Sequence, residues 1–394
     1  MVHSLILFTH YGGAKISRSR FLASAKKNIL ILKAAGLADF CIVTIVTSCE
    51  PFIAELDNSV QSLSDNKLLL ISRWPLFLTP AVSRILCLFL LPLQMLWIRL
   101  FNDKPNLFAF YNTLASESVG MLMAALLYPD TPCILFYDDD LRARHSPRRA
   151  LDLFFWSMAK KFSNLRHVFA VNNLLAAEVS QFGINSSILP CLVDLRPILK
   201  KSVNDCNRQL KICYSGGLEH EKGADMIFEL AKNLSPDYCL NVTGSGSMQA
   251  KFSSLSGEIN NVFYHGCLEE IDLISLYLES DVFLCLHTYM PGVFPFKIVE
   301  ALYYGMVVIS SPIDLPEWLS CIDGLIVLPS LNYSLNPVAS LLNQLAMTAS
   351  YAKLHNSRVS YVQDIIEKNC SVLSLALKLK SFSNFSGFYN YANS

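Results

Sequence analysis

The sequence predicts an α/β protein made of two doubly wound, parallel-sheet domains in tandem. Three observations predict this class. At 394 residues, the chain is longer than one ordinary core requires. Short apolar runs rich in β-branched and aromatic residues alternate with helix-length segments from end to end, which indicates parallel strands covered by helices on both faces. The alternation pauses once, at residues 189–208, where two prolines and mixed charges interrupt it, and then restarts.

The first half of the chain is expected to form one such domain over residues 1–190. Its predicted strands are the apolar runs Ser4–Thr9, Phe40–Thr47, Leu68–Ser72, Leu107–Tyr111, Cys133–Tyr137 and His167–Val171. Its predicted helices are the segments Ser19–Ala35, Pro51–Leu63, Ala81–Leu100, Ala115–Leu127 and Ala150–Phe162.

After a linker at residues 191–208, the same pattern predicts a second domain over residues 209–371. Its predicted strands are Leu210–Ser215, Tyr238–Thr243, Val262–His265, Val282–Leu286, Val307–Ser310 and Gly324–Leu328. Its predicted helices are Lys222–Asn233, Ser247–Ser256, Ile271–Glu279, Lys297–Tyr304 and Asn336–Ser350. Two such domains imply a cleft between them, with ligands bound at the carboxyl ends of the strands.

Composition argues against several classes of protein. Lys plus Arg and Asp plus Glu number 32 each, so no net positive charge attracts nucleic acid, and no nucleic-acid partner is expected. The 12 cysteines are scattered without a CxxC pair or a zinc-like grouping, which indicates a reducing cytoplasm. The apolar run Leu5–Phe8 is too short for a signal peptide. We therefore expect a cytoplasmic protein.

One segment, Ile85–Ile98, is apolar except for Gln94 and is bounded by two arginines. As a helix it would span about 21 Å, which is shorter than the hydrocarbon core of a membrane. The segment fits either a buried helix of the first domain or a helix lying in a membrane interface. The second alternative predicts peripheral attachment to the inner face of the plasma membrane.

Two loops in the second half have the residues that phosphate binding requires. In the first, a predicted strand ends in Gly216 and Gly217, and a helix opens near Lys222. Backbone N–H groups at such a turn, with a lysine beside them, suit a diphosphate. In the second, residues 291–301 (PGVFPFKIVEA) lead into a helix on which Lys297 and Glu300 share one face. Taken singly, ordinary turn glycines and a surface ion pair explain the two loops as well.

Together with two further stretches, these loops resemble the retaining glycosyltransferases of family four, a group with the GT-B fold. The matching stretches are 214–223 (YSGGLEHEKG), 242–246 (VTGSG), 262–268 (VFYHGCL) and 294–301 (FPFKIVEA). Residues 304–312 then stand in the place of that family's GxPVIxSxxP. The resemblance covers residues 210–330, and the first half resembles the family in architecture and length alone.

The resemblance implies two Rossmann-like domains facing a central cleft, with the nucleotide sugar held by the second domain. Lys222 would contact the donor diphosphate, Glu300 the ribose, and the backbone near Phe294–Lys297 the distal phosphate. The last helix, in the tail at residues 372–394, would return to the first domain. The donor-binding residues implied in this way are Gly12, Gly13, Gly216, Gly217, Lys222, Gly244, Phe294, Pro295, Lys297 and Glu300.

Two positions depart from the family pattern. Gly217 stands where the family's first turn usually carries an arginine. Gly292 stands where the first glutamate of the family's paired-glutamate motif normally contacts the transferred sugar. We hypothesise that Lys297 supplies the positive charge that is missing at Gly217.

In the first half, Asp138, Asp139 and Asp140 directly follow a predicted strand, at the edge where ligands bind. Asp139 or Asp140 is predicted to bind the acceptor hydroxyl or to accept its proton. Two alternatives stay open: an acidic helix cap, and a DxD metal site of the GT-A fold. The second diphosphate-binding domain argues against the GT-A fold, so no metal is expected.

The predicted activity is that of a hexosyltransferase-like enzyme, which moves a sugar from a nucleoside diphosphate sugar to a hydroxyl. Retention is expected, with no required metal and no other cofactor. A growing cell-surface glycan or its lipid carrier is the expected acceptor. Two alternatives remain: a nucleotide-sugar epimerase of the GT-B fold, and a catalytically inactive member that only binds the nucleotide sugar.

Overall fold

The computed structural model describes most of both predicted domains. The described residues are 3–9, 22–47, 67–72, 93, 95–96, 99, 105–112, 115–138, 156–159, 161, 164–193, 209–287, 294–329, 338–340, 342 and 351–384. The predicted helix Pro51–Leu63 and most of Ala81–Leu100 lie outside them.

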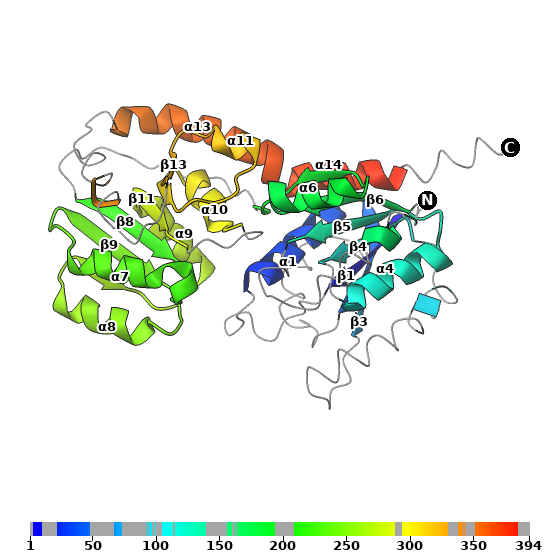
Figure 1. Ribbon diagram of the computed structural model, residues 1–394, viewed down its shortest axis with the longest axis horizontal. Coiled ribbons are helices and arrows are strands. Elements are labelled where there is room, and N and C mark those ends of the chain that lie inside the picture. The colour runs from blue at the N-terminus through cyan, green and yellow to red at the C-terminus, as the bar shows by residue number, and fades with distance from the viewer. Residues whose placement is uncertain are drawn as a thin grey trace. The chain divides into compact units, whose positions relative to one another are not determined.

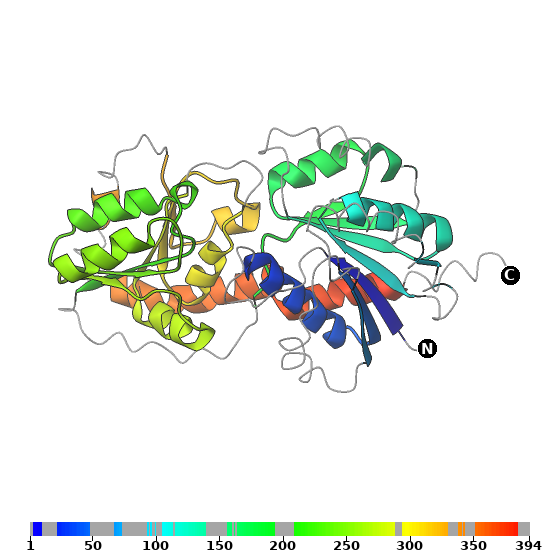
Figure 2. The same ribbon diagram turned by 90° about the horizontal axis from the view of Figure 1, so that it is seen from below.

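The chain divides into two compact units, which are treated separately below. The N-terminal unit comprises Met1–Leu195 and Asn369–Ser394, and the C-terminal unit comprises Arg196–Lys368. Each unit contains one parallel sheet with helices packed on it (Figures 1 and 2). This is the α/β class, with two Rossmann-like domains, that the sequence predicts. No helix among the described residues is both long and apolar enough to span a bilayer.

The sheet of the N-terminal unit has seven strands, and all of its pairings are parallel. The strands are β1 (His3–Thr9), β2 (Phe40–Thr47), β3 (Lys67–Ser72), β4 (Leu107–Tyr111), β5 (Cys133–Tyr137), β6 (Leu165–Ala170) and β7 (Ser186–Ile188). Their order is β3-β2-β1-β4-β5-β6-β7, so the connection changes direction between β1 and β4. Strands β4 and β5 are buried at every residue, which explains their continuous apolar sequence.

Among the described residues, the helices of this unit include α1 (Leu22–Leu37), α4 (Ala115–Leu127), α6 (Asn173–Gln181) and α14 (Val372–Asn384). The last of these comes from the far end of the chain and packs beside α1 (Figure 2). Leu375 and Leu379 of α14 share one hydrophobic core with Leu30 and Ile31 of α1. The sequence did not predict α6, which begins after Asn172, whose side chain accepts a hydrogen bond from Leu175 N (3.0 Å).

The C-terminal unit contains a six-stranded parallel sheet of order β10-β9-β8-β11-β12-β13. The strands are β8 (Leu210–Ser215), β9 (Tyr238–Thr243), β10 (Val262–Tyr264), β11 (Val282–Cys285), β12 (Val307–Ser310) and β13 (Leu325–Val327). The helices are α7 (Ala224–Lys232), α8 (Gln249–Glu258), α9 (Glu270–Glu279), α10 (Lys297–Tyr303), α11 (Glu317–Ser320) and the long α13 (Tyr351–Cys370). A short 3₁₀ turn, η3 (His220–Lys222), precedes α7.

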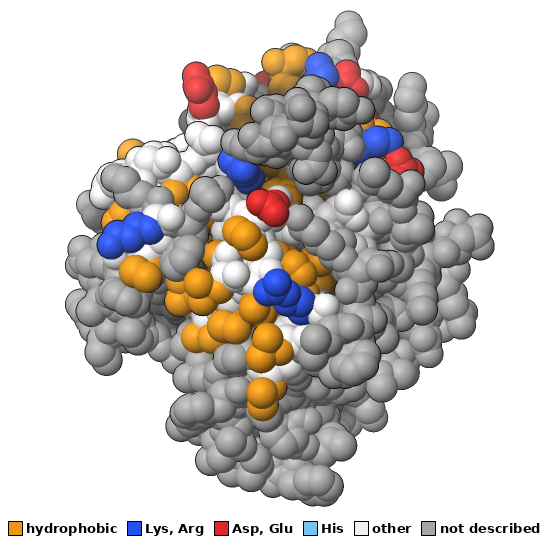
Figure 3. Space-filling view, turned by 90° about the vertical axis from the view of Figure 1, so that its right-hand side faces the viewer, with side chains coloured by type: hydrophobic (Ala, Val, Ile, Leu, Met, Phe, Trp, Pro, Cys, Tyr) orange, Lys and Arg blue, Asp and Glu red, His pale blue; other side chains and the backbone are white. Residues whose placement is uncertain are grey.

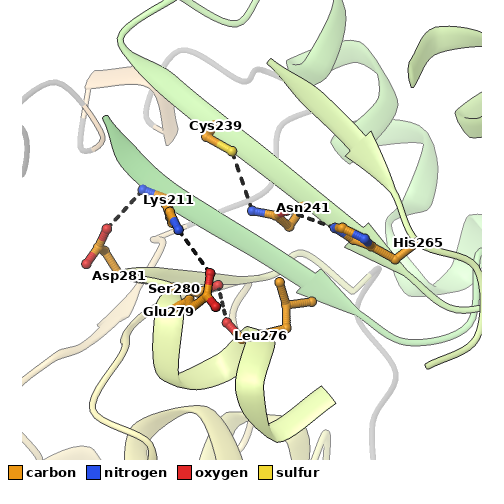
Figure 4. Close-up of polar contacts among 8 residues, drawn as sticks. All are labelled: Lys211, Cys239, Asn241, His265, Leu276, Glu279, Ser280 and Asp281. Atoms are coloured by element: carbon orange, nitrogen blue, oxygen red, sulfur yellow. Dashed lines mark hydrogen bonds and ion pairs between the residues drawn. The ribbon is translucent and has the colours of Figure 1, made fainter. Parts of the chain in front are cut away.

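One face of this sheet carries a strip of polar side chains along β8 and β9 (Figure 4). The Asn241 amide, buried in β9, lies within 2.8 Å of His265 Nε2 and 3.6 Å from Cys239 Sγ. Lys211 of β8 is fixed at both ends: its backbone N–H donates to Asp281 (2.9 Å), and its Nζ pairs with Glu279 (3.0 Å). Its hydrogen bond with Asn241 holds His265 in this strip, outside the loops described next.

Candidate functional site

The chain changes direction in the C-terminal sheet between β8 and β11. These strands are neighbours, with Val282 opposite Ile212 and Phe283 opposite Cys213. In an open parallel sheet, the crevice for a ligand lies at the carboxyl ends of the two strands beside such a point. The loops that start there are the glycine turn after Ser215 and the segment after Cys285.

The glycine turn after β8 is held by hydrogen bonds to the Tyr214 side chain and to the end of β9 and the loop after it. The Tyr214 hydroxyl reaches the carbonyl oxygens of Gly217 (2.8 Å) and Lys222 (3.3 Å). Gly216 N donates to Thr243 O (3.1 Å), and Leu218 N donates to Ser245 O (2.9 Å) in the loop after β9. Gly217 itself is exposed. The turn therefore has a fixed shape and presents its outer backbone to solvent.

Two glycines allow the loops to approach each other more closely than any side chain would permit. Gly223 has a left-handed φ of 74°, and a Cβ there would lie 1.9 Å from Leu286 O, just after β11. A Cβ on Gly244, at φ 133°, would lie 1.8 Å from Gly216 O. Real Cβ atoms do not come this close, so both positions require glycine. The left-handed Gly223 also separates η3 from α7, so the helix begins at Ala224 rather than at the predicted Lys222.

The charged residues of the turn are in different situations. Glu219 is occupied, because its carboxylate accepts from Ser247 Oγ (2.6 Å) and Ser247 N (3.2 Å). The Lys222 side chain runs past Gly217, with Cγ 3.8 Å from where a Cβ on that glycine would be. Burial first, and then the nearby Lys222 charge, lower the pKa of His287 to about 3. Lys222 therefore brings a positive charge close to both strand ends.

The second predicted loop leads into α10, where Lys297 and Glu300 form an ion pair. Lys297 Nζ lies 2.8 Å from Glu300 Oε2, and the side chains are only 25% and 9% exposed. Burial alone would lower the pKa of Lys297, but the Glu300 carboxylate and the Tyr277 hydroxyl raise it above its ordinary value. The pair is thus mostly buried and charged, unlike the solvated surface pair that spacing alone suggested. Phe294 and Pro295, before the helix, are buried.

The far end of α10 is tied to α13. Arg358 donates to Gly305 O (3.2 Å), and Gln363 donates to Tyr303 O (3.0 Å). A cation at the last carbonyls of a helix also interacts favourably with its dipole. Helix α10 is therefore fixed at its carboxyl end while its first turn remains at the candidate site.

Four predicted site residues of the N-terminal unit lie outside the described residues: Gly12, Gly13, Asp139 and Asp140. Gly292 of the C-terminal unit lies outside them as well. Asp138, at the end of β5, is described. Its Oδ1 lies 2.5 Å from Lys27 Nζ, and its Oδ2 accepts from the Tyr111 hydroxyl at 2.6 Å. Its backbone N–H donates to the Asn112 side chain (2.7 Å), and Asn112 itself has a left-handed φ of 64°.

This network bears on the chemistry of the three aspartates. A DxD metal site would need Asp138 as one of its two carboxylates. Here both of its oxygens are engaged by a buried cation and a phenol, which leaves it poorly suited to bind a metal ion. Sequence analysis missed Lys27 and Tyr111 as partners of this residue. The sequence held no clear signal, because Lys27 stands in the polar stretch Lys26–Asn28 of α1.

Comparisons with known proteins give a family match for part of the chain. Residues 196–317 match the sequence model of the family "Glycosyl transferases group 1". No curated protein matches the chain significantly.

Solved structures match over nearly the whole chain. A glycosyltransferase from Rickettsia africae is similar at a TM-score of 0.68 and 14% identity, covering 98% of this chain and 99% of that one. HepE from Anabaena, in complex with UDP, is similar at a TM-score of 0.65 and 14% identity, over 96% and 98%. The lipopolysaccharide outer core galactosyltransferase WaaB is similar at 0.61 and 13%, over 97% and 99%.

These similarities define the fold of the chain. The chain has the GT-B fold of glycosyltransferases, as the sequence predicts. Its C-terminal unit contains a region that matches glycosyl transferases group 1, and this region includes the glycine turn, Lys222, Lys297 and Glu300.

Proposed function

We propose that this chain is a glycosyltransferase that moves a hexosyl group from a nucleoside diphosphate sugar to a hydroxyl. The observation that carries the proposal is the placement of Lys222. It stands beside the rigid Gly216–Gly217 turn, at the point where the C-terminal sheet changes direction. Such a site suits a diphosphate, and the similar HepE binds UDP in one structure and UDP-glucose in another.

In the proposed reaction, the bond between the sugar C1 and the donor diphosphate breaks, and a bond from C1 to the acceptor oxygen forms. The acceptor hydroxyl loses its proton, and negative charge develops on the leaving diphosphate. Lys222 and the backbone N–H groups of the glycine turn would stabilise that charge. The first turn of α10 adds little to this, because Ile298 N and Val299 N already donate to Pro295 O and Phe296 O (3.0 Å each).

Several finer parts of the proposal rest on the family resemblance and on residues outside the described ones. Glu300 would bind the donor ribose, and Asp139 or Asp140 would position or deprotonate the acceptor. We propose that the reaction retains the anomeric configuration and needs no metal. The engaged carboxylate of Asp138 supports the second point, because the DxD alternative would use it.

A glycan or a lipid-linked sugar in cell-surface glycan synthesis is the proposed acceptor, with the enzyme held peripherally at the inner membrane face. Part of the apolar segment Ile85–Ile98 supports this. Met95 is fully buried, whereas Leu93 and Leu96 are 63% and 42% exposed. Figure 3 shows hydrophobic side chains gathered near the middle of one face, with charged side chains of both signs among and beside them. Two exposed leucines beside a buried methionine suit a helix that lies in a membrane interface.

One experiment tests the central proposal. A panel of nucleotide sugars is screened first for thermal stabilisation and then for turnover with glycan and lipid-linked acceptors, with and without EDTA. Transfer that survives EDTA supports the proposal. Epimerised donor in the absence of acceptor would instead identify an epimerase, and rescue by manganese after EDTA would identify a metal site.

A catalytically inactive nucleotide-sugar-binding protein is the second candidate. The specific observation in its favour is Gly217, which leaves the glycine turn without the arginine usual in the resembled family. Stabilisation by a nucleotide sugar, without turnover on any acceptor, would support it.

A further inference from the structure

The Lys297–Glu300 pair sits on an aromatic support supplied by another helix. Tyr277 of α9 is 1% exposed, and Lys297 Nζ lies 5.5 Å from the centroid of its ring. The Tyr277 ring also contacts Tyr304 at the end of α10 (centroids 5.7 Å apart) and Phe283 of β11 (6.1 Å). The lysine side chain is therefore confined between its own helix and α9.

Because the Lys297 side chain is confined, its ammonium can pair only with an anion close to it. Among the described residues, the ammonium pairs with Glu300 Oε2, which is one helical turn further on at 2.8 Å. An aromatic face attracts a cation, and the low solvent exposure of both partners strengthens the pair. Burial raises the pKa of Tyr277 more than the Lys297 charge lowers it, so the phenol stays neutral. The pair thus has one cation and one anion on a neutral support.

We propose that Lys297 is a positioning residue that orients Glu300 toward the ribose hydroxyls of the donor, and that it does not bind the diphosphate. This inference rests on the proposed function, in which Glu300 binds the ribose. It replaces the hypothesis that Lys297 compensates for the arginine missing at Gly217. With Lys297 committed to Glu300, Lys222 is the lysine that serves the diphosphate.

Orienting Glu300 and binding the diphosphate are two different roles for Lys297, and they predict different changes in affinity when the ribose hydroxyls are removed. If Lys297 acts through Glu300, removing it should weaken binding only when the ligand has hydroxyls for Glu300 to bind. If Lys297 binds phosphate, the loss should persist when those hydroxyls are removed. The same logic applies to a double substitution, since residues acting through one contact give non-additive effects.

The experiment measures calorimetric affinities for UDP, GDP and ADP, and then for the 2′,3′-dideoxy analogue of the tightest binder. The variants are Lys297→Met, Glu300→Gln and the double variant. The matched control is Lys232→Met, which removes an equally spaced but exposed pair with Glu229 (2.8 Å) on α7. We expect Lys297→Met to lose about tenfold in affinity for the ribonucleotide, as expected for a charge-assisted contact. We expect no loss with the dideoxy analogue and none for Lys232→Met.

The double variant keeps the test valid if Lys297→Met alone fails to fold, because it removes both charges of the buried pair together. We expect it to bind as weakly as Glu300→Gln and no more weakly. A further loss in the double variant, or an equal loss with the dideoxy analogue, would overturn the proposal, as would unchanged affinity in Lys297→Met. If the wild-type protein binds none of the three nucleotides, the proposed function itself fails.

Discussion

Gly223 lies directly against the Leu286 carbonyl, where the turn that carries Lys222 meets the segment after β11. A Cβ at position 223 would lie 1.9 Å from the Leu286 carbonyl oxygen, and the φ of Gly223 is 74°. This contact joins the turn that carries Lys222 to the carboxyl end of β11. The geometry of the site therefore depends on a residue without a side chain at this position.

Gly223→Ala is expected to destabilise the protein by at least about 2 kcal/mol, because the backbone clash adds to the strain of a left-handed alanine. Any folded fraction should bind nucleoside diphosphate more weakly, since the turn must shift. Gly257→Ala is the control. It lies in α8 with open space around it, so it should gain about 0.5–1 kcal/mol. Denaturant unfolding measures both, and equal stability of the two variants would contradict the expectation.

Lys222→Ala should weaken binding of the preferred nucleoside diphosphate by about 1.5–3 kcal/mol, which is tenfold or more. The reason is the loss of a cation beside the diphosphate turn. Lys251→Ala, on α8, removes a cation that lies near Phe228 and should change affinity less than twofold. Calorimetry checks both variants. An unchanged affinity in Lys222→Ala would show that Lys222 does not bind the diphosphate.

His287 should make stability depend on pH. Burial first, and then the Lys222 charge, lower its pKa from 6.5 to about 3. A folded-state pKa below the unfolded one means that the unfolded chain binds the proton more tightly. The contribution of neutral His287 is therefore present above about pH 6.5 and is lost as the pH falls toward 3. The free energy of unfolding should fall by up to about 1.4 kcal/mol per pH unit from this group.

The measurement compares the wild-type protein with His287→Gln between pH 7 and pH 4.5. The difference in unfolding free energy should shrink or reverse at the acidic end, because glutamine does not titrate. His167, whose pKa burial lowers to about 4, acts in the same direction in both proteins and cancels in the comparison. Parallel pH profiles of the two proteins would show that His287 does not titrate on unfolding.

Joint replacement of Leu93 and Leu96 by glutamate should reduce binding to vesicles that contain phosphatidylglycerol. Both side chains are exposed, so stability should change by no more than about 0.5 kcal/mol per site. The control is Phe263→Glu on β10, an exposed apolar residue of the C-terminal unit, which should leave vesicle binding unchanged. Vesicle co-sedimentation with thermal melts distinguishes lost binding from unfolding. Wild-type protein that stays unbound would end the membrane proposal.

The sequence predicted the sheets well and the side-chain partners poorly, for a physical reason. Buried parallel strands must be apolar throughout, so Leu107–Tyr111 and Cys133–Tyr137 could be bounded to the residue. The three-residue strand β7 (SSI) is intermediate in burial and has no such signal. The pairing of Lys27 with Asp138 spans 111 positions, and no periodicity reports a contact so distant in sequence.

The same limit applied to Lys297. Its spacing to Glu300 predicted that the two share a face, but a helix pattern does not show whether that face is buried. The structure places Tyr277 against it, and this converts a pair that would contribute little at the surface into a confined one. Tertiary packing, rather than the local motif, decides which anion the lysine serves.

The three consecutive aspartates should separate into one structural residue and an acceptor-facing pair. Asp138 neutralises a buried lysine, with Lys27 Nζ at 2.5 Å and side chains that are 8% and 13% exposed. Removing one partner of such a pair leaves an uncompensated buried charge, so Asp138→Asn should lose about 3 kcal/mol of stability. Tyr111→Phe should lose less, since it removes one hydrogen bond and leaves the ion pair.

Asp139→Asn and Asp140→Asn should behave in the opposite way, keeping the stability of the wild type. If one of them accepts the acceptor proton, its replacement should lower kcat by about 10²–10⁴-fold with donor affinity unchanged. If the leaving phosphate accepts the proton instead, the aspartate only positions the acceptor, and the acceptor KM should rise modestly. Slow hydrolysis of the donor without acceptor provides the internal control, because neither role affects it. Wild-type transfer rates in both variants would reduce the pair to a helix cap. A stability loss equal to that of Asp138→Asn would show that all three aspartates are structural.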